Sequence, residues 1–121
     1  MKTIRRILVL ILLLLPALVF AGEADVVKVE VGKSGSSYDF NVTVQHSDEG
    51  WQHYADKWDI IGPDGQVLAT RVLHHPHVNE QPFTRSLSGV AIDVGTRSII
   101  VRAHDLVHGY GGKEMVVEMP R

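Results

Sequence analysis

Three histidines lie within four positions of a short segment that also carries two prolines. This segment, residues 74–85, contains His74, His75 and His77 together with Glu80. Proline fixes its own φ and biases the preceding residue toward extended geometry, so the sequence predicts a stiff loop here rather than a helix or a central strand. Imidazole and carboxylate groups on such a loop are typical of a metal site or a binding site, because loops held by a rigid scaffold often carry function.

The other histidines fall into two further groups with similar chemistry. His53 is followed closely by Asp56, and His104 is separated from His108 by three residues. Histidines and carboxylates gathered from several loops are the ligands of Zn²⁺, Cu²⁺ or non-haem iron. Each group alone is a weak signal. Their convergence would indicate a divalent transition metal.

The same loops allow a different function. Trp51, Tyr110 and Arg85 could contact a partner protein or a glycan, and Glu80 could form an ion pair that anchors the loop through Arg85. A hydrolase is less favoured, because the chain has no G-x-S-x-G turn to hold a nucleophilic serine. The sequence therefore favours a binding protein over an enzyme.

The first 21 residues predict a secretory signal peptide. Three basic residues within the first six positions precede an almost unbroken apolar run over 7–20, and the small residue Ala21 precedes a cleavage point at Gly22. A membrane-spanning helix needs about 20 apolar residues, more than this run provides. No cysteine follows the run, which argues against lipid attachment at the cleavage point. We expect a periplasmic or secreted domain over 22–121, with no membrane span after cleavage.

The composition excludes several classes of site. The chain contains no cysteine, which excludes disulfides, thiolate metal ligands, blue-copper centres and cysteine nucleophiles. Its formal net charge is −2, and subtracting the three basic residues of the predicted signal leaves −5. Nucleic-acid binding needs a basic face instead. The roughly 100 residues after the signal suit one small domain, which a hydrophobic core or a bound ligand must stabilise.

Alternating apolar and polar residues predict an all-β domain. No sustained 3.6-residue period occurs outside the first 21 residues, and turn signals separate seven segments at 27–31, 38–45, 51–61, 66–73, 83–90, 98–105 and 113–119. Short strands at this spacing predict a single antiparallel two-sheet sandwich, immunoglobulin-like or fibronectin-III-like, with Trp58 in its core. An open meander or a small barrel is the alternative.

The predicted strand order sorts the histidines to one end of the domain. In an up-and-down order, successive connections alternate between two ends. The connections after the first, third and fifth strands hold no histidine, whereas those after the second, fourth and sixth hold or border all seven. Five acidic residues map to the same end: Asp48, Glu49, Asp56, Glu80 and Asp105. We therefore predict one histidine-rich pole.

Three motifs resemble a family of small exported proteobacterial proteins of uncharacterised function. They are HYADxW over 53–58, HPHxxEQPFTRS over 75–86 and RAHDxVHGYGG over 102–112. The resemblance covers most of the chain after the predicted signal. It implies an exported domain and carries no known activity, so no catalytic residue can be transferred.

The resemblance also ranks the candidate ligands. Four histidines inside the motifs are predicted to bind Zn²⁺ or Cu²⁺: His53, His75, His77 and His108. Further ligands, or groups that orient an imidazole, are His104, Asp56, Glu80 and Asp105. His46 and His74 lie outside the motifs and rank lower.

A looser likeness concerns periplasmic copper-resistance sandwiches, which are similar in size and compartment and also lack cysteine. Those proteins begin the mature chain with a histidine ligand, whereas Gly22 stands here. The function predicted from the sequence is therefore metal binding by an exported β-sandwich. The alternatives are a module that contacts a partner protein or a glycan and, third, a small metal-dependent enzyme.

Overall fold

Seven strands and no α-helix make up residues 22–121, the part of the chain that the computed structural model describes. The predicted signal peptide lies outside the described residues. In chain order the strands are β1 (Asp25–Ser34), β2 (Ser37–Gln45), β3 (Ala55–Ile61), β4 (Val67–Val72), β5 (Phe83–Val90), β6 (Ser98–Asp105) and β7 (Met115–Glu118). Within residues 22–121, no helix is long and apolar enough to cross a membrane.

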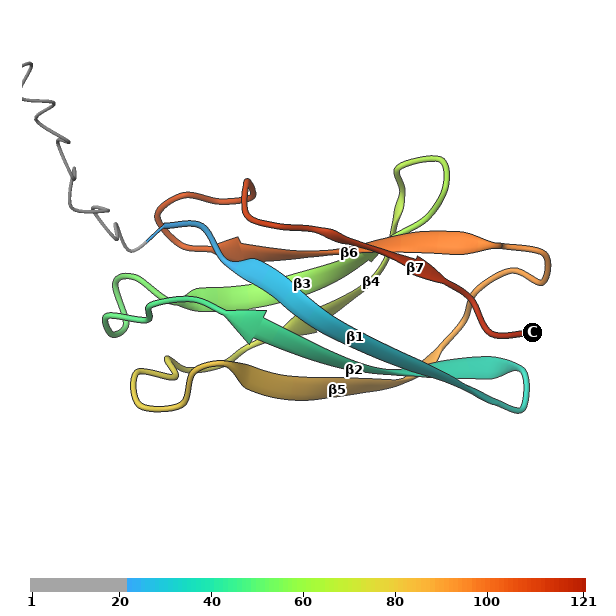
Figure 1. Cartoon of the computed structure of the whole chain (residues 1–121), viewed down its shortest axis with the longest axis horizontal. Helices are drawn as coiled ribbons and strands as arrows, with labels where there is room; N and C mark the ends of the chain where they lie inside the picture. The colour runs from blue at the N-terminus through green and yellow to red at the C-terminus, as the bar shows by residue number, and fades with distance from the viewer. Residues whose placement is uncertain (1–21) are drawn as a thin grey trace, which may run out of the picture.

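The strands form two separate antiparallel sheets. One sheet has the order β1-β2-β5 and the other has the order β4-β3-β6-β7. Figure 1 shows the two layers, with the strands of both running along the long axis of the domain. The predicted antiparallel sandwich is confirmed, and the two sheets do not close into a barrel.

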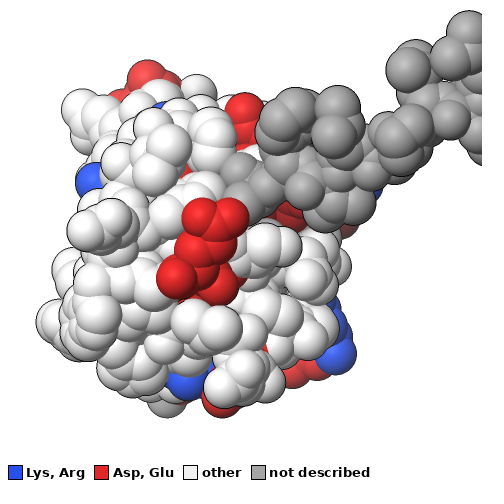
Figure 2. Space-filling view, turned by 90° about the vertical axis from the view of Figure 1, so that its left-hand side faces the viewer, with Lys and Arg blue, Asp and Glu red and all other residues white. Residues whose placement is uncertain are grey.

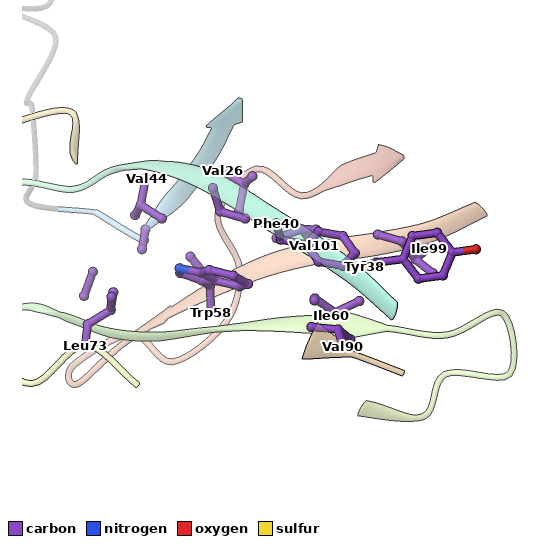
Figure 3. Close-up of a cluster of buried hydrophobic side chains, with 14 of the residues drawn as sticks. Val26, Tyr38, Phe40, Val44, Trp58, Ile60, Leu73, Val90, Ile99 and Val101 are labelled. Carbon is purple, nitrogen blue, oxygen red and sulfur yellow. The ribbon is translucent and has the colours of Figure 1, made fainter. Parts of the chain in front are cut away.

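The core follows from the alternation that the sequence displays. Phe40, Val42 and Val44 on β2 are fully buried, whereas Asp39 and Asn41 between them are exposed. The Trp58 side chain on β3 fills the middle of the core, between the two sheets (Figure 3). Replacing a buried tryptophan with alanine typically costs about 3–5 kcal/mol, so this side chain is a main source of stability in a domain without disulfides.

Two predicted strands begin later than expected because glycines permit other contacts. Gly50 has a φ of 126° and accepts a hydrogen bond from the His53 amide, so the chain turns before β3 and His53 lies outside the strand. A Cβ atom on Gly112 would stand 2.0 Å from the carbonyl oxygen of Ala24. Only glycine allows this close approach, which places the segment before β7 against the start of β1.

The three histidine-bearing connections lie at the same end of the sandwich. Figure 1 shows the loops after β2, β4 and β6 together at the left, whereas the turns after β1, β3 and β5 lie toward the right. This arrangement follows because successive strands run in opposite directions along the chain, both within a sheet and where the chain crosses from one sheet to the other. We call the end formed by residues 46–54, 73–82 and 106–114 the histidine pole.

Candidate metal centre

Three buried side chains at the histidine pole bring metal-ligating atoms together. They are His46, His53 and Asp105, which we call the His–Asp triad. One ligand atom of each lies within 4.8 Å of the others. Exposure of the three residues is 2%, 8% and 0%. His46 follows β2 and Asp105 ends β6, so the triad joins the two sheets at one end of the core.

The triad contains three buried polar atoms without a hydrogen-bond partner. These atoms are Nε2 of His46, Nε2 of His53 and Oδ2 of Asp105. Residues 22–121 contain only five such side-chain atoms, and the other two belong to Trp58 and His77. An unpaired buried polar atom costs about 1–3 kcal/mol, so proteins retain few of them. Three such atoms in one cluster form a group that could hold a metal ion.

A carboxylate holds the other ring nitrogen of each triad histidine. Nδ1 of His46 lies 2.5 Å from Oδ1 of Asp48, and Nδ1 of His53 lies 3.4 Å from Oε2 of Glu49. A carboxylate at Nδ1 favours the tautomer with a proton on that nitrogen, which leaves the lone pair of Nε2 free. This is the arrangement that orients an imidazole toward a metal ion.

Asp48 is itself fixed by two backbone amides. Its Oδ1 accepts a hydrogen bond from the Ala55 amide at 3.1 Å, and its Oδ2 accepts one from the His77 amide at 2.7 Å. Burial raises the pKa of Asp48, but the hydrogen bonds from His46, His77 and Ala55 outweigh it and hold the pKa below the usual 3.8. Asp48 is therefore ionised at neutral pH.

Asp105 is ionised for a similar reason. Its Oδ1 accepts hydrogen bonds from the amides of Val107 at 2.9 Å and His108 at 2.7 Å. Burial raises the pKa of Asp105, but these backbone hydrogen bonds, with a smaller contribution from the neighbouring His46 and His108 side chains, hold it below 3.8. No Lys or Arg among residues 22–121 pairs with Asp48 or Asp105.

The site therefore carries two buried negative charges that no basic side chain offsets. Desolvating a carboxylate costs several kcal/mol; the backbone amides offset part of this cost, and a positive charge beside the pair would offset more. That charge can come from protonated imidazoles or from a bound cation. Figure 2, which views the molecule from this end, shows acidic side chains near the middle of the face and at its edges, and basic ones toward its margins.

The structure brings together three of the residues predicted from the sequence. His53 and Asp105 belong to the triad, and His108 lies beside them: its Nδ1 is 3.2 Å from Oδ1 of Asp105. The rings of His53 and His108 have centroids 5.1 Å apart. His108 is thus in contact with the triad at its outer side, where a third of its side chain is exposed.

The predicted ligands of the β4–β5 loop lie outside the triad. The ring of His77 is stacked on Phe83 with centroids 4.1 Å apart, and Arg85 donates to its Nε2 at 2.8 Å. His75 is exposed and packs against His77. Glu80 forms an ion pair with Arg85 at 3.0 Å, the anchoring alternative considered above.

The remaining candidates lie on the outer face of the four-stranded sheet or in solvent. Nδ1 of His104 is 2.6 Å from Oδ1 of Asp56, and the His104 ring meets Tyr110 edge-on. Trp51 is 68% exposed, and its ring forms a T-shaped contact with Tyr54. These side chains do not reach the triad.

Reasoning from the sequence ranked His46 low and gave Asp48 no role at the site. The sequence nevertheless contained a signal for His46 and Asp48, namely the alternation of buried and exposed residues along β2. Phe40, Val42 and Val44 point into the core, and the same two-residue step continues through His46 and Asp48, which are also buried. Polar residues that continue an inward-facing series are strong candidates for a buried site.

Comparison with known proteins finds one homologue. A protein of the archaeon Halomicrobium mukohataei, named "Putative lipoprotein", is 42% identical to this chain over 97 residues, which is 79% of this chain and 47% of the archaeal protein. The chain thus spans about half the length of this relative. This relative comes from an archaeon. That proteins with the three motifs occur in proteobacteria stays a prediction. No family model matches the chain. No solved structure matches it either.

Proposed function

We propose that this protein binds a divalent transition metal, Zn²⁺ or Cu²⁺, through Nε2 of His46, Nε2 of His53 and a carboxylate oxygen of Asp105. The observation that carries the proposal is the convergence of their three unpartnered buried atoms. Imidazole and carboxylate suit both ions. The lone pairs of the two Nε2 atoms and of the carboxylate oxygen would then be donated to the metal ion.

The distances support this assignment. Ligands at about 2.0–2.2 Å from a tetrahedral ion stand roughly 3.3–3.6 Å apart. Nε2 of His53 is 3.4 Å from Oδ1 of Asp105, and Nε2 of His46 is 3.9 Å from its Oδ2. Each imidazole is near a different oxygen of Asp105, and the three ligand atoms lie within 4.8 Å of one another, so the side chains would have to draw closer for one ion to contact all three. The carboxylates of Asp48 and Glu49 would hold the two imidazoles in place.

We also propose that the protein is exported. The apolar run over 7–20, preceded by basic residues, supports a signal peptide. The name of the archaeal relative describes a lipoprotein, a class of exported proteins, and fits the same compartment. Fractionation of cells that express the full chain tests this. Finding the unprocessed chain in the cytoplasm would contradict it.

Metal content and thermal stability test the proposed function directly. The protein is produced from the full chain without a histidine tag, and its metal content and melting temperature are measured with and without chelator. We expect near-stoichiometric Zn²⁺ or Cu²⁺ and a lower melting temperature after chelation, because an ion at 100 times its Kd stabilises the folded state by about 2.7 kcal/mol. A melting temperature unchanged by chelator and by both ions would contradict metal binding and leave protonated imidazoles as the balancing charge.

One observation favours a second candidate function, a module that contacts a partner protein or a glycan. Five large hydrophobic side chains are exposed on the loops of the histidine pole: Trp51, Val78, Leu106, Val107 and Tyr110. Exposed aromatic and aliphatic groups around a polar centre are typical of contact surfaces. Absence of metal together with loss of a bound partner in Trp51→Ala would favour this function.

A further inference from the structure

We infer that the metal keeps at least one open coordination position, filled by water or another small monodentate ligand, and that His108 orients Asp105 rather than completing the coordination. This inference rests on the proposed function. It concerns what the site can take up, since a metal saturated by protein ligands can only hold the fold, whereas an open metal can bind or activate a ligand.

The contacts of His108 carry the first step. Its amide and its Nδ1 both approach Oδ1 of Asp105, at 2.7 Å and 3.2 Å. The backbone around it is closed by mutual hydrogen bonds between Asp105 and Gly109, where Gly109 has a φ of 69°. The loop therefore directs its hydrogen-bond donors to Oδ1 of Asp105. The other carboxylate oxygen, Oδ2, has no hydrogen-bond partner. One oxygen is used for positioning and the other is left for a metal.

His108 also differs from the two triad histidines in what holds its Nδ1. In His46 and His53 this nitrogen faces a carboxylate outside the triad, so that Nε2 is left for the metal. In His108 the same nitrogen faces the triad carboxylate itself. The Nδ1 side of the His108 ring thus faces the carboxylate that is proposed to bind the metal, which suits a residue that orients Asp105. The protein thus supplies three ligands, the number typical of metal sites that keep a water molecule.

Exposure shows where the open position lies. The side chains of His46 and Asp105 are fully buried, whereas those of His53, His108 and Glu49 are 10%, 33% and 62% exposed. The sandwich therefore closes one side of the triad, and the side bordered by His53 and His108 faces solvent. The rings of these two residues are in contact, with centroids 5.1 Å apart, so they border the site on its solvent side.

Cobalt substitution tests the inference. The protein from the full chain is loaded with Co²⁺, whose visible spectrum reports the number and kind of ligands, and is titrated separately with azide and with imidazole. We expect a saturable spectral change with at least one of them. His108→Ala is expected to bind Co²⁺ at the same stoichiometry with about 10–100-fold lower affinity, the usual effect of losing a group that orients a ligand, and to respond to the same probe.

Two results would overturn the inference, and they separate it from the proposed function. If neither probe changes the wild-type spectrum, and His108→Ala loses the intense bands of a four-coordinate ion, then His108 is the fourth ligand and metal binding stands. If the wild type binds no Co²⁺, both proposals fall. His74→Ala is the matched control, because His74 is an exposed histidine away from the triad, and it should behave as wild type.

Discussion

Two aspartates are almost fully buried at different places in this small domain, and they differ in the hydrogen-bond partners of their carboxylate oxygens. Asp59 on β3 is 1% exposed and Asp105 at the end of β6 is 0% exposed. In both, burial raises the pKa, and hydrogen bonds outweigh burial to hold the pKa below the usual 3.8. Both therefore bear a negative charge at neutral pH. What separates them is whether the protein satisfies that charge.

Asp59 is satisfied entirely by protein groups. Thr70 donates to its Oδ1 at 2.6 Å, Tyr110 donates to its Oδ2 at 2.5 Å, and Nε of Arg102 is 3.4 Å from the same oxygen. The Arg102 guanidinium also lies over the Tyr110 ring, 3.9 Å from its centroid. This complete shell fastens the β6–β7 loop to the outer face of the sheet.

Asp105, in contrast, keeps one oxygen without a partner and faces two imidazole nitrogens in the same condition. Within residues 22–121 the other two such atoms lie apart, on Trp58 and His77, so the grouping of three is what distinguishes the triad. The comparison teaches that burial and ionisation alone do not mark a ligand site, because Asp59 has both. The unsatisfied atoms do.

The strongest test of this contrast removes a triad ligand. We expect His46→Ala to lower Zn²⁺ or Cu²⁺ affinity by more than about 100-fold, beyond the about 10–100-fold typical of groups that only orient a ligand. Competition with a chromogenic chelator measures this. Asp59→Asn is the control and should keep the affinity while losing stability. An equal loss in His77→Ala, which the sequence ranked above His46, would move the site to the β4–β5 loop.

Replacing Asp48 should have the next largest effect on metal affinity. Asp48→Asn keeps the shape of the side chain but removes the charge that favours a proton on Nδ1 of His46. We expect about 10–100-fold weaker metal binding with an unchanged far-UV spectrum. The tautomer of His46, measured by ¹⁵N NMR, should become mixed. An unchanged affinity would show that Asp48 is only a structural partner.

Substitutions around Asp59, whose charge is satisfied by protein groups, should change the stability of the protein and not its metal affinity. Tyr110→Phe removes one donor to buried Asp59, and we expect the free energy of unfolding to fall by about 1–3 kcal/mol in urea. Tyr54→Phe is a matched control, because the Tyr54 hydroxyl makes no hydrogen bond within residues 22–121. A loss of metal binding in Tyr110→Phe would mean that the two clusters are coupled.

Acid pH should weaken the metal-free protein through the same carboxylates. The folded pKa of Asp59 lies below its usual 3.8, so the unfolded state binds more protons between the two values. The stabilisation is therefore complete above pH 3.8 and is lost as the pH falls through the folded pKa. Asp59→Asn should flatten this part of the stability curve, measured by urea unfolding in chelator. An identical acid slope in the variant would contradict the prediction.

The smallest effect is expected at the histidine that the sequence placed among the first ligands. His75 is exposed, so His75→Ala should change metal affinity by no more than about twofold, within the roughly 0.5 kcal/mol typical of surface substitutions. The same chelator competition measures it. A tenfold loss would bring the β4–β5 loop back into the site.

The fold class was predictable because its signals are local. The alternation from Tyr38 to Val44 fixes which side of β2 faces the core, and the Gly62–Gly65 turn joins β3 to β4. The same signals placed all seven histidines at one end. Candidate residues His53, Asp105 and His108 could be named from their chemistry and their place near that end.

The membership of the triad depended on contacts that no local pattern contains. His46 follows a strand of one sheet and Asp105 ends a strand of the other, and His53 lies in a turn where its amide donates to the Gly50 carbonyl. The prolines and histidines of the β4–β5 loop looked like ligands, yet the His77 amide binds Asp48 and its ring packs on Phe83. The sequence by itself determined an all-β sandwich with a histidine-rich end, since side-chain alternation and turn chemistry are properties of neighbouring residues. Tertiary structure alone decided which imidazoles keep an unpaired nitrogen, because that depends on the carboxylates and amides that packing brings from elsewhere in the chain.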